Sequence, residues 1–110
     1  MTQHQELAAG RWGTFTLAEQ LANVGSEVSR AARWQGRDDG RFQSAVERGF
    51  ELLDLTLADA RWRTTHRLKE LARLRELFAA ATLGLDEYAT SLQDLDRYLL
   101  PYAVAARSTH

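Results

Sequence analysis

The 110-residue chain contains no cysteine, one proline and one methionine. Without thiols it can form neither a disulfide framework nor a thiolate metal site, and it has no cysteine nucleophile. β-Branched residues are scarce, whereas Ala, Leu, Arg and Glu are abundant, and this composition favours helix throughout the chain. No apolar run is long enough for a signal peptide or a membrane span, so the sequence predicts a cytoplasmic protein without a membrane partner.

Lysine is almost absent as well, because 13 of the 14 basic side chains are arginines, and the formal net charge is −1. This balance argues against bulk affinity for nucleic acid. The cations are nevertheless concentrated in one stretch, since residues 61–76 hold six basic side chains and two carboxylates. A local patch of this kind permits a focused contact with an anionic partner.

Four segments of about 18 to 22 residues carry apolar residues at helical spacing. The first, residues 16–35, begins with Thr16 and Glu19 at the spacing of a capping box. Two glycines, at 36 and 40, bracket an acidic turn before the second segment, residues 41–60. Gly49 lies at the centre of its apolar side, where the missing side chain lets a neighbouring helix approach closely. The inner faces of the two segments are formed by Leu17, Leu21, Val24, Val28 and Ala31, and by Phe42, Val46, Gly49, Leu53 and Leu57.

The third segment is expected to start after Thr64 or Thr65 and to stop at Gly84. The fourth starts near Asp86 or Ser91. The inner faces of these segments are formed by Leu68, Leu71, Phe78 and Thr82, and by Tyr88, Leu92, Leu95, Leu99, Tyr102 and Ala106.

Arg75 is an exception to this pattern, because a helical wheel places it between Leu68 and Leu71 on the inner face. A buried guanidinium needs a carboxylate, so we expect an ion pair with Glu27 or Asp96 from another helix. The alternative is that its stem reaches the edge of the core.

These segments, joined by loops of roughly 4 to 8 residues, predict an all-α protein that folds as an antiparallel up-down four-helix bundle. Residues 1–13 are expected to be a flexible leader, which Trp12 can pin to the bundle, and residues 14–110 a single domain. Pro101 lacks a backbone donor, so the last helix should kink or fray there. Apolar residues outside the inner faces are either ordinary surface or a second buried face, which a homo-oligomer or a helical partner would cover. They are Leu55, Leu77, Leu100 and Val104.

The sequence predicts no metal site and no cofactor. Ferritin-like bundles use Glu-x-x-His pairs, and no histidine here has a glutamate three residues before it. Glu47, Glu51 and Asp54 share a helical face, but that face is opposite the apolar stripe and should be solvated.

The stretch ADARWRTTHRLKELARLRE, residues 58–76, is the candidate binding surface. Arginine supplies forked donors for phosphate, and Trp62 can stack on a base. The alternative is a solvated helix face whose cations pair with Glu70 and Glu76. The candidate nucleic-acid-binding residues are Arg61, Trp62, Arg63, Arg67, Lys69 and Arg73.

The same stretch contains Arg61 and His66 as Arg-x4-His, which resembles the signature of HEPN-domain ribonucleases, small all-α proteins that act as dimers. The resemblance implies that both residues, from two protomers, line one cleft and act on an RNA phosphodiester. The histidine would assist proton transfer, and the arginine would stabilise the developing phosphorane charge. Trp62 departs from that signature, because a polar residue is usual after its arginine.

A longer resemblance rests on LAEQLANVGSEVSRAARWQGRDD, residues 17–39, followed by AVERGFELLDLTLAD, residues 45–59. These runs resemble a group of small bacterial four-helix-bundle proteins over residues 17 to about 107, and the resemblance implies no particular activity. The architecture is also similar to that of accessory proteins of diversity-generating retroelements. Those proteins are ring-forming, basic-surfaced scaffolds that assist a reverse transcriptase.

We therefore predict a non-enzymatic, homo-oligomeric interaction module whose basic face binds RNA or DNA, or a nucleic-acid-processing protein. One alternative is a HEPN-like ribonuclease, such as the toxin of a two-gene system, with Arg61 and His66 as its catalytic residues. The other is a bundle that binds only protein, through an acidic partner that meets the basic face.

Overall fold

The computed structural model describes residues 10–84 and 90–108, and the fold over these ranges is all-α. A helical turn at residues 10–12 comes first. No helix in the described part of the chain is both long and apolar enough to cross a membrane. The remaining helices are α2 (Leu17–Trp34), α3 (Asp39–Leu57), α4 (Ala60–Arg63), α5 (Arg67–Leu83) and α6 (Leu92–Ser108).

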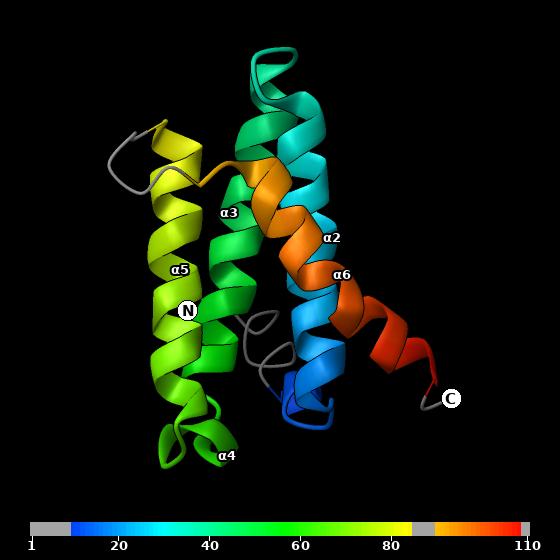
Figure 1. Ribbon diagram of the computed structural model, residues 1–110, viewed down its shortest axis with the longest axis vertical. Helices are drawn as coiled ribbons and strands as arrows, with labels where there is room; N and C mark the ends of the chain where they lie inside the picture. The colour runs from blue at the N-terminus through cyan, green and yellow to red at the C-terminus, as the bar shows by residue number, and fades with distance from the viewer. Residues whose placement is uncertain (1–9, 85–89, 109–110) are drawn as a thin grey trace.

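The helix arrangement centres on α2. In Figure 1, α2 and α3 run side by side in opposite directions, α5 lies beside α3, and α6 crosses α2 obliquely. The packing of α2 against α6 and α3 is extensive, whereas α5 packs mainly against α3 and touches α6 only sparsely. The all-α prediction is therefore confirmed, but a regular four-helix up-down bundle is not.

Most predicted helix ends are confirmed. Thr16 accepts a hydrogen bond from the Glu19 N–H at 3.1 Å, and the Glu19 carboxylate accepts one from the Thr16 N–H at 2.8 Å, which completes the capping box. At the other end of the chain, Ser91 caps α6 in the same way with Asp94. α5 stops at Gly84, whose φ of 70° is the left-handed conformation that glycine adopts without strain.

The turn between α2 and α3 differs from the prediction. Gly36 has a φ of 75° and makes the turn, whereas Gly40 lies inside the first turn of α3. The carboxylate of Asp38 caps α3 by accepting the Arg41 N–H at 3.0 Å, so the helix starts earlier than the second glycine. Pro101 also lies within a continuous α6, which runs on to Ser108.

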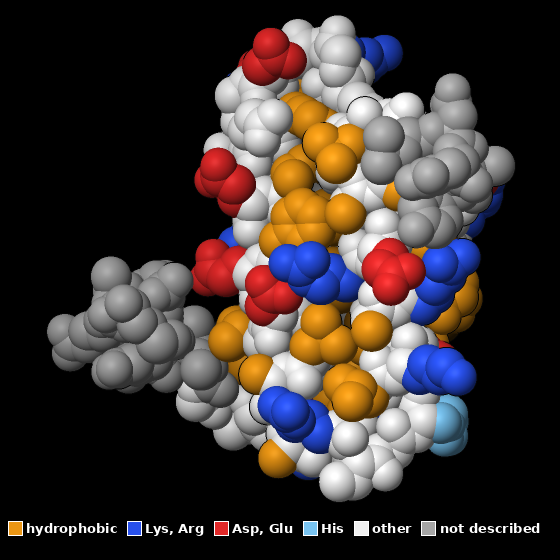
Figure 2. Space-filling model, turned by 90° about the vertical axis from the view of Figure 1, so that its left-hand side faces the viewer, with side chains coloured by type: hydrophobic (Ala, Val, Ile, Leu, Met, Phe, Trp, Pro, Cys, Tyr) orange, Lys and Arg blue, Asp and Glu red, His pale blue; other side chains and the backbone are white. Residues whose placement is uncertain are grey.

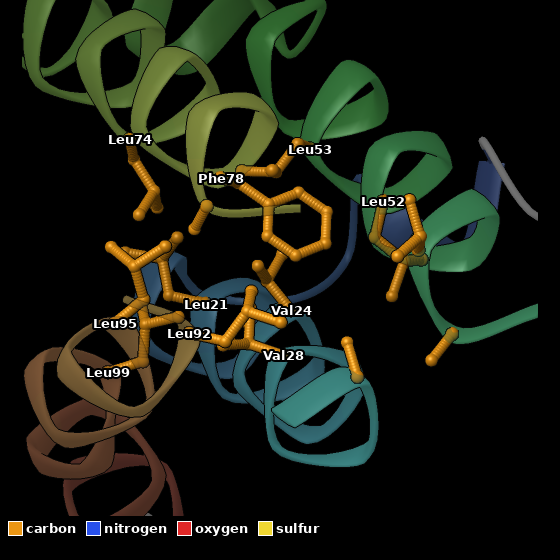
Figure 3. Packing of buried hydrophobic residues seen from close by; sticks show 14 of the residues in the cluster. Leu21, Val24, Val28, Leu52, Leu53, Leu74, Phe78, Leu92, Leu95 and Leu99 are labelled. Carbon is orange, nitrogen blue, oxygen red and sulfur yellow. The ribbon is translucent and has the colours of Figure 1, made fainter. Parts of the chain in front are cut away.

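The core is centred on the fully buried ring of Phe78, which points from α5 toward α2 and α3 (Figure 3). Around it lie aliphatic side chains of all four long helices: Leu21, Val24 and Val28, Leu52 and Leu53, Leu74, and Leu92, Leu95 and Leu99. A Cβ at Gly49 would lie 2.8 Å from the Phe78 Cζ, so the predicted close approach at this glycine is confirmed.

Arg75 forms an ion pair with a carboxylate of another helix, as predicted, but its partner is Asp54 and not Glu27 or Asp96. Its Nε donates to the Asp54 carboxylate at 2.7 Å, and its guanidinium lies 4.9 Å from the centroid of the Phe50 ring. The predicted partner Glu27 is instead bonded to Arg30 at 2.6 Å. The wheel failed because the inner face of α5 is centred on the buried Leu71, Leu74 and Phe78, which turns Arg75 toward α3 and the surface.

The Gly49→Ala substitution is expected to lower the free energy of unfolding by about 1–3 kcal/mol, because the new methyl group overlaps the ring of Phe78. Urea denaturation followed by circular dichroism measures this change. Gly40→Ala on the same helix is the matched control, since the nearest atom to its Cβ would be 3.6 Å away. It should be neutral or stabilise by about 0.4–1 kcal/mol, and a larger loss there than at Gly49 would contradict this account.

Candidate functional site

The candidate stretch is not one helix. Asp59 caps the single turn of α4 by accepting the Arg61 N–H at 3.0 Å, and α4 ends at Arg63. His66 is the N-cap residue of α5, but its side chain makes no capping hydrogen bond. The hydroxyl of Thr65 instead accepts the Arg67 N–H at 3.1 Å, close to the predicted cap. The cations of this region therefore belong to two helices with a three-residue turn between them.

Arg61 uses its guanidinium inside the protein. Its Nε and Nη2 donate to the two oxygens of Asp59 at 3.0 and 2.7 Å, and Nη2 also donates to the Phe15 carbonyl at 2.7 Å. The hydrogen bonds from Arg61, and then the one from Gln20, lower the pKa of Asp59 to about 2 against partial desolvation. Asp59 in turn raises the pKa of Arg61. The bidentate ion pair holds the guanidinium in place at the start of α4, and its hydrogen bond to the Phe15 carbonyl joins α4 to the segment before α2.

Trp62 is also engaged within the fold. Its indole N–H donates to the Gln20 side-chain oxygen at 3.0 Å, and the ring packs partly buried against the core. The guanidinium of Arg61 lies 4.6 Å from the ring centroid. The predicted role of Trp62 as a stacking platform for a base has no support in this geometry, because its polar atom and one of its faces are already occupied.

Gln20 is the fully buried centre of these contacts. Its amide nitrogen donates to the Trp12 carbonyl at 3.0 Å and to Asp59 at 2.9 Å, while its oxygen accepts from Trp62. The Trp12 indole donates to the buried hydroxyl of Thr56 at 3.0 Å. We name these residues, together with Arg61, the Gln20 network. Trp12, assigned from the sequence to the leader, is thus part of the core, while residues 1–9 of that leader lie outside the described residues.

The remaining candidate cations lie on the surface. Arg63, Arg67, Lys69 and Arg73, which we name the basic strip, are all exposed. Arg67 pairs with Glu70 at 3.6 Å, and Arg73 pairs with Glu76 at 3.2 Å. Arg63 and Lys69 form no ion pair within residues 10–84 and 90–108. In Figure 2, Lys and Arg side chains gather along the right-hand edge of the face, beside a hydrophobic stripe at its centre.

His66 is exposed on the turn between α4 and α5. The structure gives no hydrogen bond between His66 and Arg61, and Arg61 is already bonded to Asp59. Across the described ranges, no group of three or more His, Cys, Asp or Glu side chains is placed to hold a metal ion.

Sequence reasoning missed Asp59 and Gln20. A signal for Asp59 was present, because aspartate is one of the preferred N-cap residues at the start of a helix. No comparable signal exists for Gln20, whose partners Trp12, Asp59 and Trp62 are distant in the sequence or precede its helix.

Comparisons with known proteins add no relative. No protein-family model matches the chain, and neither the curated proteins nor the solved structures contain a significant match.

The ion pair of Asp59 should make stability depend on pH. The native pKa of Asp59 is about 2, against an ordinary value of 3.8, so below about pH 4 the unfolded chain binds a proton that the native protein does not. The stability that the charged group contributes should therefore be complete above about pH 4 and decline toward pH 2. Urea unfolding over this range gives the free energy of unfolding of the wild type and of Asp59→Asn. The difference between the two free energies should shrink as the pH falls.

Asp39→Asn, at an exposed aspartate in the first turn of α3, is the control and should not reproduce this trend. A difference between wild type and Asp59→Asn that stays constant down to pH 2 would show that the charge of Asp59 contributes nothing.

Proposed function

We propose that the protein is a non-enzymatic, homo-oligomeric interaction module of the bacterial cytoplasm whose basic strip binds single-stranded nucleic acid. Its scaffold is an up-down arrangement of four long helices. The observation that carries the proposal is that four exposed cations follow one another closely along α4 and α5, and two of them have no ion pair in the described part of the chain.

The carboxylates beside the strip do not prevent phosphate binding. Glu70 and Glu76 pair with their cations at i,i+3 spacing on the exposed surface of α5. Such pairs contribute only about 0.3–0.5 kcal/mol, because water competes with them and the side chains lose entropy. A phosphate can therefore replace the carboxylate at little cost, and the guanidinium fork matches its geometry.

The geometry supports the ribonuclease alternative less well than it supports the binding module. A catalytic arginine must have donors free to meet the developing charge on phosphorus. Arg61 points its donors at Asp59 and Phe15 instead, so it would have to abandon three hydrogen bonds to act on a substrate.

A homo-oligomer is supported by apolar side chains on the outer side of α6. Leu100 is 58% exposed and Val104 is 52% exposed, and they lie one turn apart. Leu55 and Leu77, the other two residues predicted to lie outside the inner faces, are half-buried against the core. Exposed apolar residues that are adjacent on one helix face are typical of contacts between protein surfaces.

The proposed binding is tested by titrating labelled single-stranded RNA with the purified protein at low salt and following fluorescence anisotropy. We expect affinity to fall as salt rises, with a slope of log K against log salt of about −0.7 for each phosphate contact. Replacing Arg63 and Lys69 together by Ala should weaken binding and make the slope shallower by about 1.4.

The double variant Arg33→Ala plus Arg37→Ala is the matched control, because it removes the same charge from exposed arginines in the last turn of α2 and in the turn that follows it. Equal losses in the two double variants would mean that net charge, not the strip, governs binding. The same samples on a denaturing gel test the alternatives. Cleavage that disappears in His66→Ala would support the ribonuclease. If the protein neither binds nor cleaves RNA, the alternative that remains is a module that binds only protein.

Sedimentation velocity tests the oligomer separately. The wild type is expected to sediment as an oligomer and Leu100→Glu as a smaller species, since the substitution places a charge in the apolar contact. Leu83→Glu is the control at another exposed leucine, 72% accessible at the end of α5, and should leave the sedimentation coefficient unchanged. A wild type that is monomeric at all concentrations would refute this part of the proposal.

A further inference from the structure

A groove with a volume of about 350 Å³ lies between α5 and α6, where the two helices pack sparsely. Its apolar lining includes Leu74 and Leu77 from α5 and Leu95 from α6, and Tyr98 forms one side. The groove falls within the size range of small-molecule sites, which typically combine an apolar lining with a few polar groups. Its polar groups include Glu70 and Arg73, which lie on the adjacent surface of α5.

Tyr98 is an aromatic side chain that remains available to a ligand. It is 53% exposed, and its ring lies 6.3 Å from the ring of Tyr102, centroid to centroid, at an angle of 59°. Burial of the hydroxyl, Tyr102 and Glu70 raise the pKa of Tyr98, while Arg67 lowers it. Glu70 and Arg73 line the same groove as Tyr98, so the ring stands beside the basic strip.

The contrast with Trp62 decides which aromatic residue can stack on a base. The Trp62 indole N–H is bonded to Gln20, and Arg61 lies over its ring. Tyr98 has no cation over its ring in the described part of the chain, and the groove opens beside it. Stacking on an aromatic side chain contributes to single-strand binding for any base, because every base has a π-face.

We infer that the groove between α5 and α6 is a nucleobase subsite, in which Tyr98 stacks on one base of a single strand whose phosphates lie on the basic strip. This inference rests on the proposed function and adds a location and a chemistry to it. Arg73 belongs to both surfaces, since it is part of the strip and lines the groove. The strip and the groove are therefore adjacent, and a strand can pass from one to the other.

The polar side of the groove also favours one kind of base. The carboxylate of Glu70 is a hydrogen-bond acceptor, and cytosine presents an exocyclic amine that a carboxylate accepts from readily. Uracil has a carbonyl at that position, which would face the carboxylate unfavourably. The subsite should consequently prefer cytosine to uracil.

The test uses labelled ten-residue oligocytidylate and oligouridylate, titrated with the full chain and followed by anisotropy. Tyr98→Ala should weaken binding to the cytidylate by about 5- to 150-fold, the loss that removal of one stacking platform produces. Tyr98→Phe keeps the ring and should bind as the wild type does, which separates stacking from a failure to fold. Glu70→Gln should abolish the preference for cytidylate over uridylate.

The salt dependence separates the two proposals. Tyr98→Ala should leave the slope of log K against log salt unchanged, because it removes no phosphate contact, whereas the Arg63 and Lys69 double variant makes the slope shallower. Wild-type affinity in Tyr98→Ala would overturn the subsite and leave the basic strip standing. A wild type that binds neither oligonucleotide would refute the proposed function and the subsite together.

Discussion

The buried amide of Gln20 is the contact on which one end of the molecule depends. Gln20 is fully buried in α2, yet both its donor and its acceptor are used, by the Trp12 carbonyl, Asp59 and Trp62. A buried amide without partners would cost several kcal/mol, so its partners must be held in register. Its hydrogen bonds join both the segment before α2 and the α3–α4 turn to this one residue of α2. Consistent with this, the described side chains leave no buried polar atom without a partner.

The same network decides which residues remain free to act. Arg61 and Trp62 carry the chemical groups that most resemble a functional site in the sequence, a guanidinium fork and an indole. The fold uses both of them internally, through Asp59 and Gln20. The candidate cations that remain on the surface are those of the basic strip on α4 and α5. A residue type suited to binding is thus informative only once its hydrogen bonds have been counted.

The sequence predicted the features that depend on local chemistry. The capping box of Thr16, the stop at Gly84 and the close approach at Gly49 each follow from the residue itself and its immediate neighbours, and each is confirmed. The partner of Arg75 was predicted wrongly because a helical wheel assumes a rotation of the helix about its axis, and only packing against the other helices fixes that rotation. Gln20 and Tyr98 were not found for a related reason: their roles are set by contacts between helices distant in the chain. The sequence predicted the region of the candidate site. It did not predict which side chains of that region are bonded within the fold and which are exposed.

The unequal packing of the helices explains where the proposed binding surfaces lie. α2 packs closely against both α3 and α6, to the point that a Cβ at Gly25 would lie 3.3 Å from the Leu99 side chain, and this leaves little of α2 for a partner. α5 is anchored mainly against α3, by Phe78 beside Gly49 and by the ion pair of Arg75 with Asp54, and its contact with α6 is sparse. Its other sides therefore carry the basic strip and one wall of the groove. Because Lys69 and Arg73 are exposed and lie on the face of α5 away from Phe78, these two cations can be substituted without loosening the core, which is the condition for separating binding from stability in this protein.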